Sequence, residues 1–244
     1  MRIPRLYVDQ PLASGSEVTL DRRAMEHAAK VLRLRAGDDL CLFDGLGGEY
    51  AAELARGVGG ALVAQVGEHT PDRVESTLSL CLVQGISRGE RMDYTLQKAV
   101  ELGVQAVVPV VTERTVLRLH GEREQRRLAH WRGVILAACE QSGRTRVPTL
   151  MAPCTLAEHL THALPGTAFL LDPRAARALT QVGPLTGPVS VLIGPEGGLA
   201  PHEREAAQAA GYRAVRMGPR VLRTETAALV ALTLLQALAG DLGA

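Results

Sequence analysis

Runs of apolar residues that stop at glycine turns mark most of the strands expected along this chain. The run Val189-Ser-Val-Leu-Ile193 has almost no polar break, so it predicts a strand buried on both faces. It stops at Gly194-Pro195, and Gly197-Gly198 then supplies backbone that can take positive φ and let a ligand approach closely. Pro201 fits the first turn of a following helix. This pattern predicts a ligand site at the carboxyl end of a strand, although a tight connection without a ligand explains it equally well.

From residue 76 onward the apolar pattern alternates between strands and helices. The first strand, the helix closed by Gly103 and the next strand form a βαβ unit, which predicts a parallel sheet. Strands are expected at 77–83, 106–111, 168–171, 189–193 and 212–217. Helices are expected at 91–102, 122–141 and 155–163, from 201 onward, and at the C-terminus.

The first 70 residues carry shorter apolar runs at closer spacing, typical of a small barrel. Asp21 can cap a helix that runs to Leu32. The turn residues between Asp44 and Gly48 predict a hairpin, and residues 67–75 interrupt the apolar pattern as a linker. Strands are expected at 6–8, 17–20, 39–43, 49–54 and 61–66. We therefore expect one domain over residues 1–72 and a second over 73–244.

Composition excludes several classes of protein. The 244 residues are 46% hydrophobic and 22% charged, which suits a globular protein with a sizeable core. The 27 basic and 26 acidic residues nearly cancel, so net charge does not indicate a nucleic-acid partner. No apolar run is long enough to span a bilayer, and no signal sequence precedes the domain, so a cytoplasmic location is expected. The four cysteines are far apart and show no metal-ligand spacing, so no metal is expected.

A second glycine-containing segment, Met217-Gly-Pro-Arg-Val-Leu-Arg-Thr-Glu-Thr-Ala227, follows the last expected strand. Neither segment matches the GxxxxGK[ST] or GxGxxG phosphate-binding spacing. Together, Gly-Pro-Glu-Gly-Gly and Leu-Arg-Thr-Glu-Thr-Ala resemble the ribosomal RNA small subunit methyltransferase E family, in the SPOUT class of S-adenosylmethionine-dependent enzymes. The resemblance covers nearly the whole chain through further segments at 27–33, 37–38, 97–103, 109–114 and 140–144.

The resemblance implies an α/β fold with a SPOUT-type parallel sheet, a C-terminal trefoil knot and an N-terminal PUA-like β-barrel that binds RNA. It implies methylation of N3 of one uridine in the decoding region of 16S rRNA, within the small ribosomal subunit, by a homodimer. Knotted chains are rare, so only the resemblance supports that feature. It also implies that two backbone segments wrap the cofactor S-adenosylmethionine. The matching residues are Leu171, Ile193, Gly194, Pro195, Glu196, Gly197, Gly198, Met217, Gly218, Leu222 and Thr224.

Three polar residues are the candidates for catalysis. Arg223 can contact phosphate or stabilise developing negative charge, but it cannot act as a base at neutral pH. Gln141 suits the edge of a uracil, and Arg144 suits a phosphate or an anionic base. Ordinary helix capping explains Gln141 and Arg144 as an alternative, and capping explains Thr224 and Glu225 as well. No residue stands out as the general base.

Basic residues of the N-terminal domain precede an acidic stretch, so the domain can present one basic face to a phosphate backbone. The candidates for RNA binding are Arg2, Arg5, Arg22, Arg23, Lys30 and Arg33. Three other functions stay open from the sequence. They are a SPOUT enzyme that methylates a ribose 2′-hydroxyl on transfer or large-subunit RNA, a non-catalytic RNA-binding factor, and a nucleotide-dependent oxidoreductase, which the missing GxGxxG disfavours.

Overall fold

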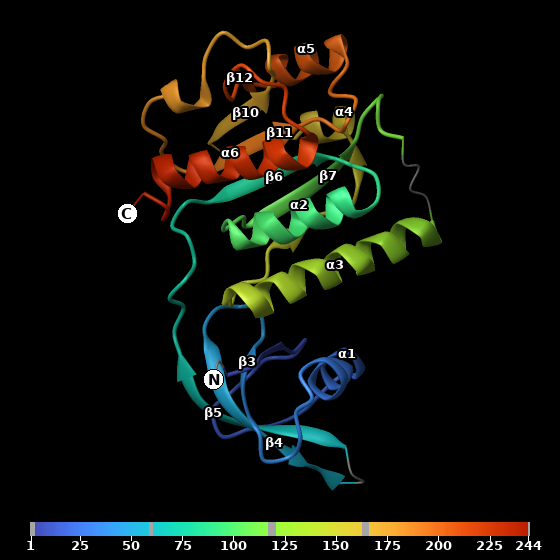
Figure 1. The fold of residues 1–244 in the computed structure, drawn as a ribbon, viewed down its shortest axis with the longest axis vertical. Helices are drawn as coiled ribbons and strands as arrows, with labels where there is room; N and C mark the ends of the chain where they lie inside the picture. Colours follow the sequence, from blue (N-terminus) through green and yellow to red (C-terminus); the bar gives the residue numbers. More distant parts are fainter. Residues whose placement is uncertain (1–2, 59–60, 117–120, 163–165, 244) are drawn as a thin grey trace. The chain divides into compact units, whose positions relative to one another are not determined.

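Two units can be distinguished in the computed structural model by the contacts within each (Figure 1). Unit 1 consists of Met1–Glu75 and Cys139–Val147, and unit 2 of Ser76–Ala138 and Pro148–Ala244. The structure describes residues 3–58, 61–116, 121–162 and 166–243. The short segment Cys139–Val147 therefore belongs with the N-terminal unit, which apolar periodicity alone does not reveal.

Unit 1 is built on one five-stranded sheet in the order β1-β3-β4-β5-β2. Strands β1 and β3 are parallel, and the other neighbours are antiparallel. The expected hairpin over β3 and β4 is confirmed, whereas β5 continues to Thr70, so the linker begins later than the expected residue 67. The strands are β1 (Arg5–Tyr7), β2 (Glu17–Thr19), β3 (Asp39–Phe43), β4 (Glu49–Arg56) and β5 (Leu62–Thr70).

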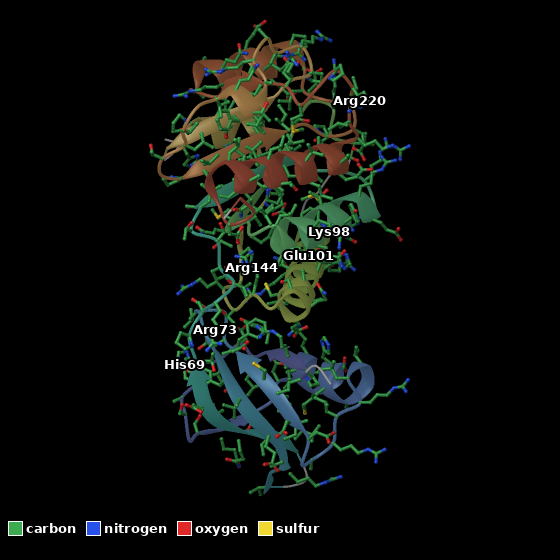
Figure 2. All side chains as sticks on the ribbon, turned by 60° about the vertical axis from the view of Figure 1, so that its left-hand side comes forward. His69, Arg73, Lys98, Glu101, Arg144 and Arg220 are labelled. Atoms are coloured by element: carbon green, nitrogen blue, oxygen red, sulfur yellow. The ribbon has the colours of Figure 1, made fainter. Side chains whose placement is uncertain are left out.

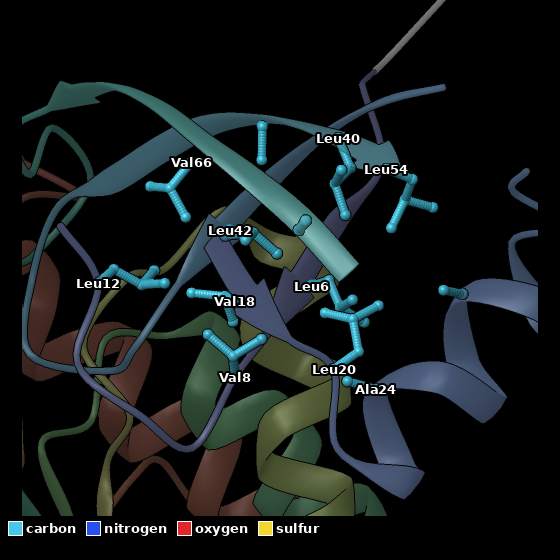
Figure 3. Close-up of a cluster of buried hydrophobic side chains, with 13 residues drawn as sticks. Leu6, Val8, Leu12, Val18, Leu20, Ala24, Leu40, Leu42, Leu54 and Val66 are labelled. Atoms are coloured by element: carbon cyan, nitrogen blue, oxygen red, sulfur yellow. The ribbon is translucent and has the colours of Figure 1, made fainter. Parts of the chain in front are cut away.

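Alternate residues of these strands face inward and form the core of unit 1 (Figure 3). Leu6, Leu42 and Leu54 have no exposed surface. The predicted helix is present as α1 (Arg22–Glu26), and the Asp21 side chain accepts a hydrogen bond from the N–H of Ala24 at 2.7 Å, as a cap should. The helix continues as a turn of π-helix, η1 (His27–Val31).

Unit 2 contains a seven-stranded sheet in the order β12-β10-β11-β6-β7-β8, with β9 also paired to β7. Every pairing in this sheet is parallel, as the βαβ pattern predicted. Its strands are β6 (Leu80–Gly85), β7 (Ala106–Val111), β8 (Thr149–Leu150), β9 (Cys154–Thr155), β10 (Thr167–Leu171), β11 (Val189–Ile193) and β12 (Arg213–Val215). Its helices are α2 (Glu90–Glu101), α4 (Leu156–Leu160), η3 (Leu179–Gln181), α5 (Pro201–Ala209) and α6 (Thr224–Ala239), and α3 (Glu122–Ser142) extends into the segment that belongs with unit 1.

Helices cover both faces of this sheet. Helices α2 and α6 pack side by side over one face (Figure 1). Residues of α4 and α5, such as Leu156 and Ala207, join Val83, Leu170 and Leu192 in the core on the other face. With both faces covered, the central strands are mostly apolar, with Ser190 of β11 and Gln84 of β6 as buried polar exceptions, and all five residues of β11 are buried. Among the described residues, no helix combines the length and apolar character needed to cross a bilayer.

Candidate functional site

The glycine turn after β11 forms the first wall of a cavity in unit 2. The N–H of Gly198 donates to the carbonyl of Pro195 at 2.8 Å, and Gly198 has φ of 66°, a conformation that favours glycine. The turn packs directly against the end of β6, because a Cβ placed on Gly85 would lie 2.5 Å from the Pro195 nitrogen. Helix α5 then starts with Pro201 in its first turn, as predicted.

The segment between β12 and α6 forms the second wall, and Thr224 joins it to the first. The Thr224 hydroxyl donates to the carbonyl of Gly194 at 2.7 Å. The side-chain amide of Gln84, at the end of β6, donates to the same hydroxyl at 2.9 Å. Since a hydroxyl has one proton, the amide of Gln84 directs that proton toward Gly194. Gln84 is fully buried and Thr224 nearly so, which shields both hydrogen bonds from water.

These walls enclose a cavity of about 620 Å³. That volume lies within the range of small-molecule and cofactor pockets. All eleven residues predicted to bind the cofactor line this cavity, and so does Arg223. They come from the ends of β10 and β11, from the glycine turn and from the segment before α6, so segments far apart in the sequence meet at the carboxyl edge of the sheet.

Charged side chains at one end of the cavity are held by ion pairs and hydrogen bonds. The guanidinium of Arg91, on α2, lies 3.0 Å from the carboxylate of Glu196, which also accepts the N–H of Arg88 at 2.9 Å. Burial raises the pKa of Glu196, but the hydrogen bonds from Arg88, from its own backbone and from Arg91, together with the charge of Arg91, bring it below its usual value. The ionised carboxylate of Glu196 therefore links the glycine turn to the start of α2.

Further cavity residues were not predicted. Arg114 donates to the carbonyl of Gly197 at 2.8 Å, and Arg204 donates to that of Leu199 at 2.8 Å. The guanidinium of Arg204 also lies 3.5 Å from the carboxylate of Asp172. Asp172 directly follows β10. A polar residue at the carboxyl end of a parallel strand is the sequence signal that could have identified it as a cavity residue. Arg220 reaches the cavity from the segment before α6 (Figure 2).

The structure places Gln141 and Arg144 in unit 1, and neither lines the cavity. Arg144, which is labelled in Figure 2, is buried. Its Nη2 lies 2.7 Å from a carboxylate oxygen of Glu75. The other oxygen of Glu75 accepts the N–H groups of Thr145 and Arg146 at 3.1 Å each. These bonds hold the segment Cys139–Val147 to the end of the N-terminal stretch.

The predicted RNA-binding residues fall into two groups. Arg22, Lys30 and Arg33 are exposed. Arg5 is largely buried, with a side chain 10% exposed, and forms an ion pair with Glu49, whereas Arg23 lies 3.0 Å from the buried carboxylate of Glu140. Arg2 lies outside the described residues. Arg22, Lys30 and Arg33 can therefore contact a phosphate backbone without breaking an ion pair like those of Arg5 with Glu49 and Arg23 with Glu140.

Comparisons with known proteins bear on the whole chain. A family described as RNA methyltransferase domain matches residues 74–236, and one described as RNA methyltransferase PUA domain matches residues 20–60. Ribosomal RNA small subunit methyltransferase E of Mycobacterium tuberculosis is 34% identical over 235 residues, which cover 93% of this chain and 88% of that protein. The chain belongs to the ribosomal RNA small subunit methyltransferase E family. The predicted resemblance is thereby confirmed.

Solved structures agree with this membership. A Legionella pneumophila protein described as a methyltransferase, in complex with the bound cofactor SAM, has a TM-score of 0.94 at 34% identity and covers 99% of this chain and 100% of its own. Ribosomal RNA small subunit methyltransferase E of Neisseria gonorrhoeae, bound to S-adenosyl methionine, has a TM-score of 0.90 at 37% identity, with 98% and 99% covered. The predicted α/β fold with a SPOUT-type parallel sheet and a PUA-like domain is confirmed for this member of the family.

Proposed function

We propose that this protein transfers the methyl group of S-adenosylmethionine to N3 of one uridine in the decoding region of 16S rRNA, with the assembled small ribosomal subunit as substrate. The cavity supports the proposal most directly: all eleven residues predicted to bind the cofactor line it, in a chain that resembles SAM-bound relatives over nearly its whole length. In this proposal unit 2 holds the cofactor, and the exposed basic residues of unit 1 contact RNA.

The two walls of the cavity supply groups that suit the adenine of the cofactor. Backbone groups of the glycine turn and of the segment around Gly218 can read the edge of an adenine, because these positions let backbone approach closely. Leu171, Ile193 and Leu222 supply apolar surface for its ring. In the proposal the segment between these walls is threaded as the trefoil knot of SPOUT enzymes.

The reaction is an in-line displacement at the sulfonium methyl carbon. The N3–C bond forms as the S–C bond breaks, and the N3 proton leaves before or during attack. Holding the two reactants in line accounts for much of the acceleration. Arg223 lines the cavity and stabilises the negative charge that develops on the uracil oxygens. Gln141, which is exposed, is proposed to contact the RNA, whereas Arg144 keeps its buried ion pair with Glu75.

A homodimer is part of the proposal. Helix α6 is rich in leucine and alanine, and Leu238 on α6 and Tyr94 on α2 are 44% and 45% exposed. Covering such side chains on two adjacent helices with a second copy removes apolar surface from water. Light scattering on the purified protein should give twice the mass of one chain.

Methyl transfer from labelled S-adenosylmethionine to small subunits that lack the modification tests the function. Digestion and nucleoside analysis should recover the label as 3-methyluridine. Label in a 2′-O-methylated nucleoside would instead indicate a ribose methyltransferase. Cofactor binding without transfer to subunits or to naked RNA would contradict the proposed substrate.

A further inference from the structure

Three carboxylates line the cavity, and two of them are held by internal bonds. Asp172 accepts the N–H of Arg174 at 2.9 Å and lies against Arg204. Glu196 accepts from Arg88 and Arg91. A carboxylate oxygen that already accepts a hydrogen bond or faces a guanidinium has less free capacity to accept the N–H of a substrate. Neither Asp172 nor Glu196 therefore suits the removal of a proton from a bound substrate.

Glu225, the second residue of α6, differs from both. Neither of its oxygens accepts a hydrogen bond from any residue that the structure describes, and Oε2 is buried. Its nearest ion-pair partner is the Nε of Arg91, at 3.9 Å, which is beyond hydrogen-bond range. The side chain is 15% exposed, so part of it still faces the cavity that it lines.

Capping does not explain this carboxylate. The N-cap of α6 is Arg223, and no side chain makes the capping hydrogen bond there. Thr224 is the first residue of the helix, and its hydroxyl is directed to Gly194. Thr224 is therefore not the cap that the alternative expected, whereas Glu225 does lie in the first turn of the helix, as that alternative expected. A carboxylate removed from water without a hydrogen-bond donor is costly, and a donor from a bound ligand would offset that cost.

We propose that the Glu225 carboxylate accepts the N3–H of the target uracil and removes its proton during methyl transfer; this inference rests on the proposed function. The N3–H bond breaks and its proton passes to a Glu225 oxygen. The N3 electron pair forms the bond to the methyl carbon, and the electrons of the S–C bond stay on sulfur. The products are 3-methyluracil, S-adenosylhomocysteine and a protonated Glu225.

The charged groups around Glu225 suit this role. Arg91 faces it from α2, close enough to orient the carboxylate electrostatically without donating a hydrogen bond. Glu196 draws the Nη1 of Arg91 to itself at 3.0 Å, which restrains that arginine. Arg223, which precedes Glu225 by two residues and lines the same cavity, is placed to stabilise the uracil anion.

The first test compares Glu225→Gln with the wild-type protein on small subunits that lack the modification. Glutamine keeps the size of the side chain but cannot take the proton. We expect kcat to fall by about 100-fold or more, as general-base catalysis predicts. The affinity for S-adenosylmethionine, measured by calorimetry, should change by less than about threefold, since the proposal gives Glu225 no cofactor contact. Glu205→Gln makes the same chemical change on the exposed face of α5 and should leave kcat unchanged.

The second test varies the acidity of the substrate. The Glu225→Gln variant should react only through ionised uracil, so its rate should rise about tenfold per pH unit while the wild-type rate changes less. Target RNA made with 5-fluorouridine, whose N3–H is more acidic, should recover much of the lost rate. A purely structural role for Glu225 would lower the rate on both substrates equally.

The outcomes separate this inference from the proposed function. If the wild-type protein makes no 3-methyluridine, the proposed function fails. If it does, and Glu225→Gln either keeps wild-type kcat or loses cofactor binding, the role of Glu225 as the base is overturned. If the glutamine variant does not fold, Glu225→Asp replaces it. Aspartate keeps a carboxylate that can accept the proton, but its shorter side chain holds that carboxylate farther from the substrate. A lower kcat with the wild-type pH profile then supports the inference, and an unchanged kcat overturns it.

Discussion

The hydroxyl of Thr224 donates to the carbonyl of Gly194 across 30 residues of sequence. This single hydrogen bond joins the glycine turn to the start of α6, and these are the two walls of the cavity. Gln84 fixes its direction by donating to the same hydroxyl. The spacing of the walls therefore depends on two linked hydrogen bonds among Gln84, Thr224 and Gly194, which come from three separate segments.

Removing this hydroxyl should loosen the cavity. Thr224→Val keeps the shape of the side chain but leaves the Gly194 carbonyl without this donor and removes one of the two acceptors of the Gln84 amide. We expect unfolding free energy to fall by about 2 kcal/mol and the affinity for S-adenosylmethionine to fall by about tenfold. Thr224→Ser keeps the hydroxyl and is the matched control. Equal cofactor affinity in the valine and serine variants, measured by calorimetry, would contradict this role.

A methyl group at Gly85 should displace the glycine turn. Its Cβ would lie 2.5 Å from the Pro195 nitrogen and 2.8 Å from the Gly194 carbonyl carbon, both of which are backbone atoms that cannot rotate away. We expect Gly85→Ala to lower both thermal stability and cofactor affinity. A Cβ on Gly133, within α3, meets nothing within 4 Å, so Gly133→Ala should raise stability by up to about 1 kcal/mol and leave binding unchanged.

Much of unit 2 could be predicted because its signals are local. The buried run Val189–Ile193 and the strand Ala106–Val111 have the bounds expected from the sequence, since a strand covered on both faces is a nearly continuous apolar run. The glycine turn and Pro201 likewise mark the start of α5. Strand and turn signals together therefore located the cavity at a sheet edge.

Long-range contacts explain what the sequence could not show. Arg144 meets Glu75 across 69 residues, and Arg23 meets Glu140 across 117 residues. Ion pairs of this kind leave no periodic pattern, so nothing marked Cys139–Val147 as part of unit 1. The role of Glu225 was undecided for the same reason, because it depends on which neighbours donate hydrogen bonds to it.

Acid should weaken unit 1 partly through Asp72. Burial raises the pKa of this carboxyl, but hydrogen bonds from the Thr145 hydroxyl and the Gly48 N–H, with the charge of Arg146, hold it below its usual value. Because the folded pKa is depressed, the resulting stability is complete above the unfolded pKa of about 3.9 and is lost as the pH falls through the folded value.

Urea unfolding between about pH 6 and pH 2.5 measures this effect. The wild-type midpoint should fall at the acidic end, and Asp72→Asn should be less stable at pH 6 but show a shallower fall. Glu17→Gln, on the exposed side of β2, is the control and should keep the wild-type slope. Parallel curves for the wild-type protein and Asp72→Asn would exclude a contribution from this carboxylate.

Exposed basic residues of unit 1 should set the salt dependence of RNA binding. Arg22 and Lys30 have side chains that are 91% and 74% exposed, and their contacts with Glu26 are surface pairs worth little to folding. Arg22→Gln and Lys30→Gln should each weaken binding of 16S rRNA and reduce the slope of log K against log salt by about one.

Arg213→Gln is the matched control, because Arg213 is exposed on β12 and does not line the cavity. Arg5→Gln tests the opposite case, a basic residue of unit 1 that contributes to stability. Arg5 is largely buried against Glu49, so its loss should lower stability by leaving a partly buried charge unpaired. Binding titrations at several salt concentrations, paired with thermal melts, separate the two effects. Unit 1 would not carry the phosphate contacts if Arg22→Gln and Lys30→Gln kept the wild-type slope, because releasing fewer counterions must flatten it.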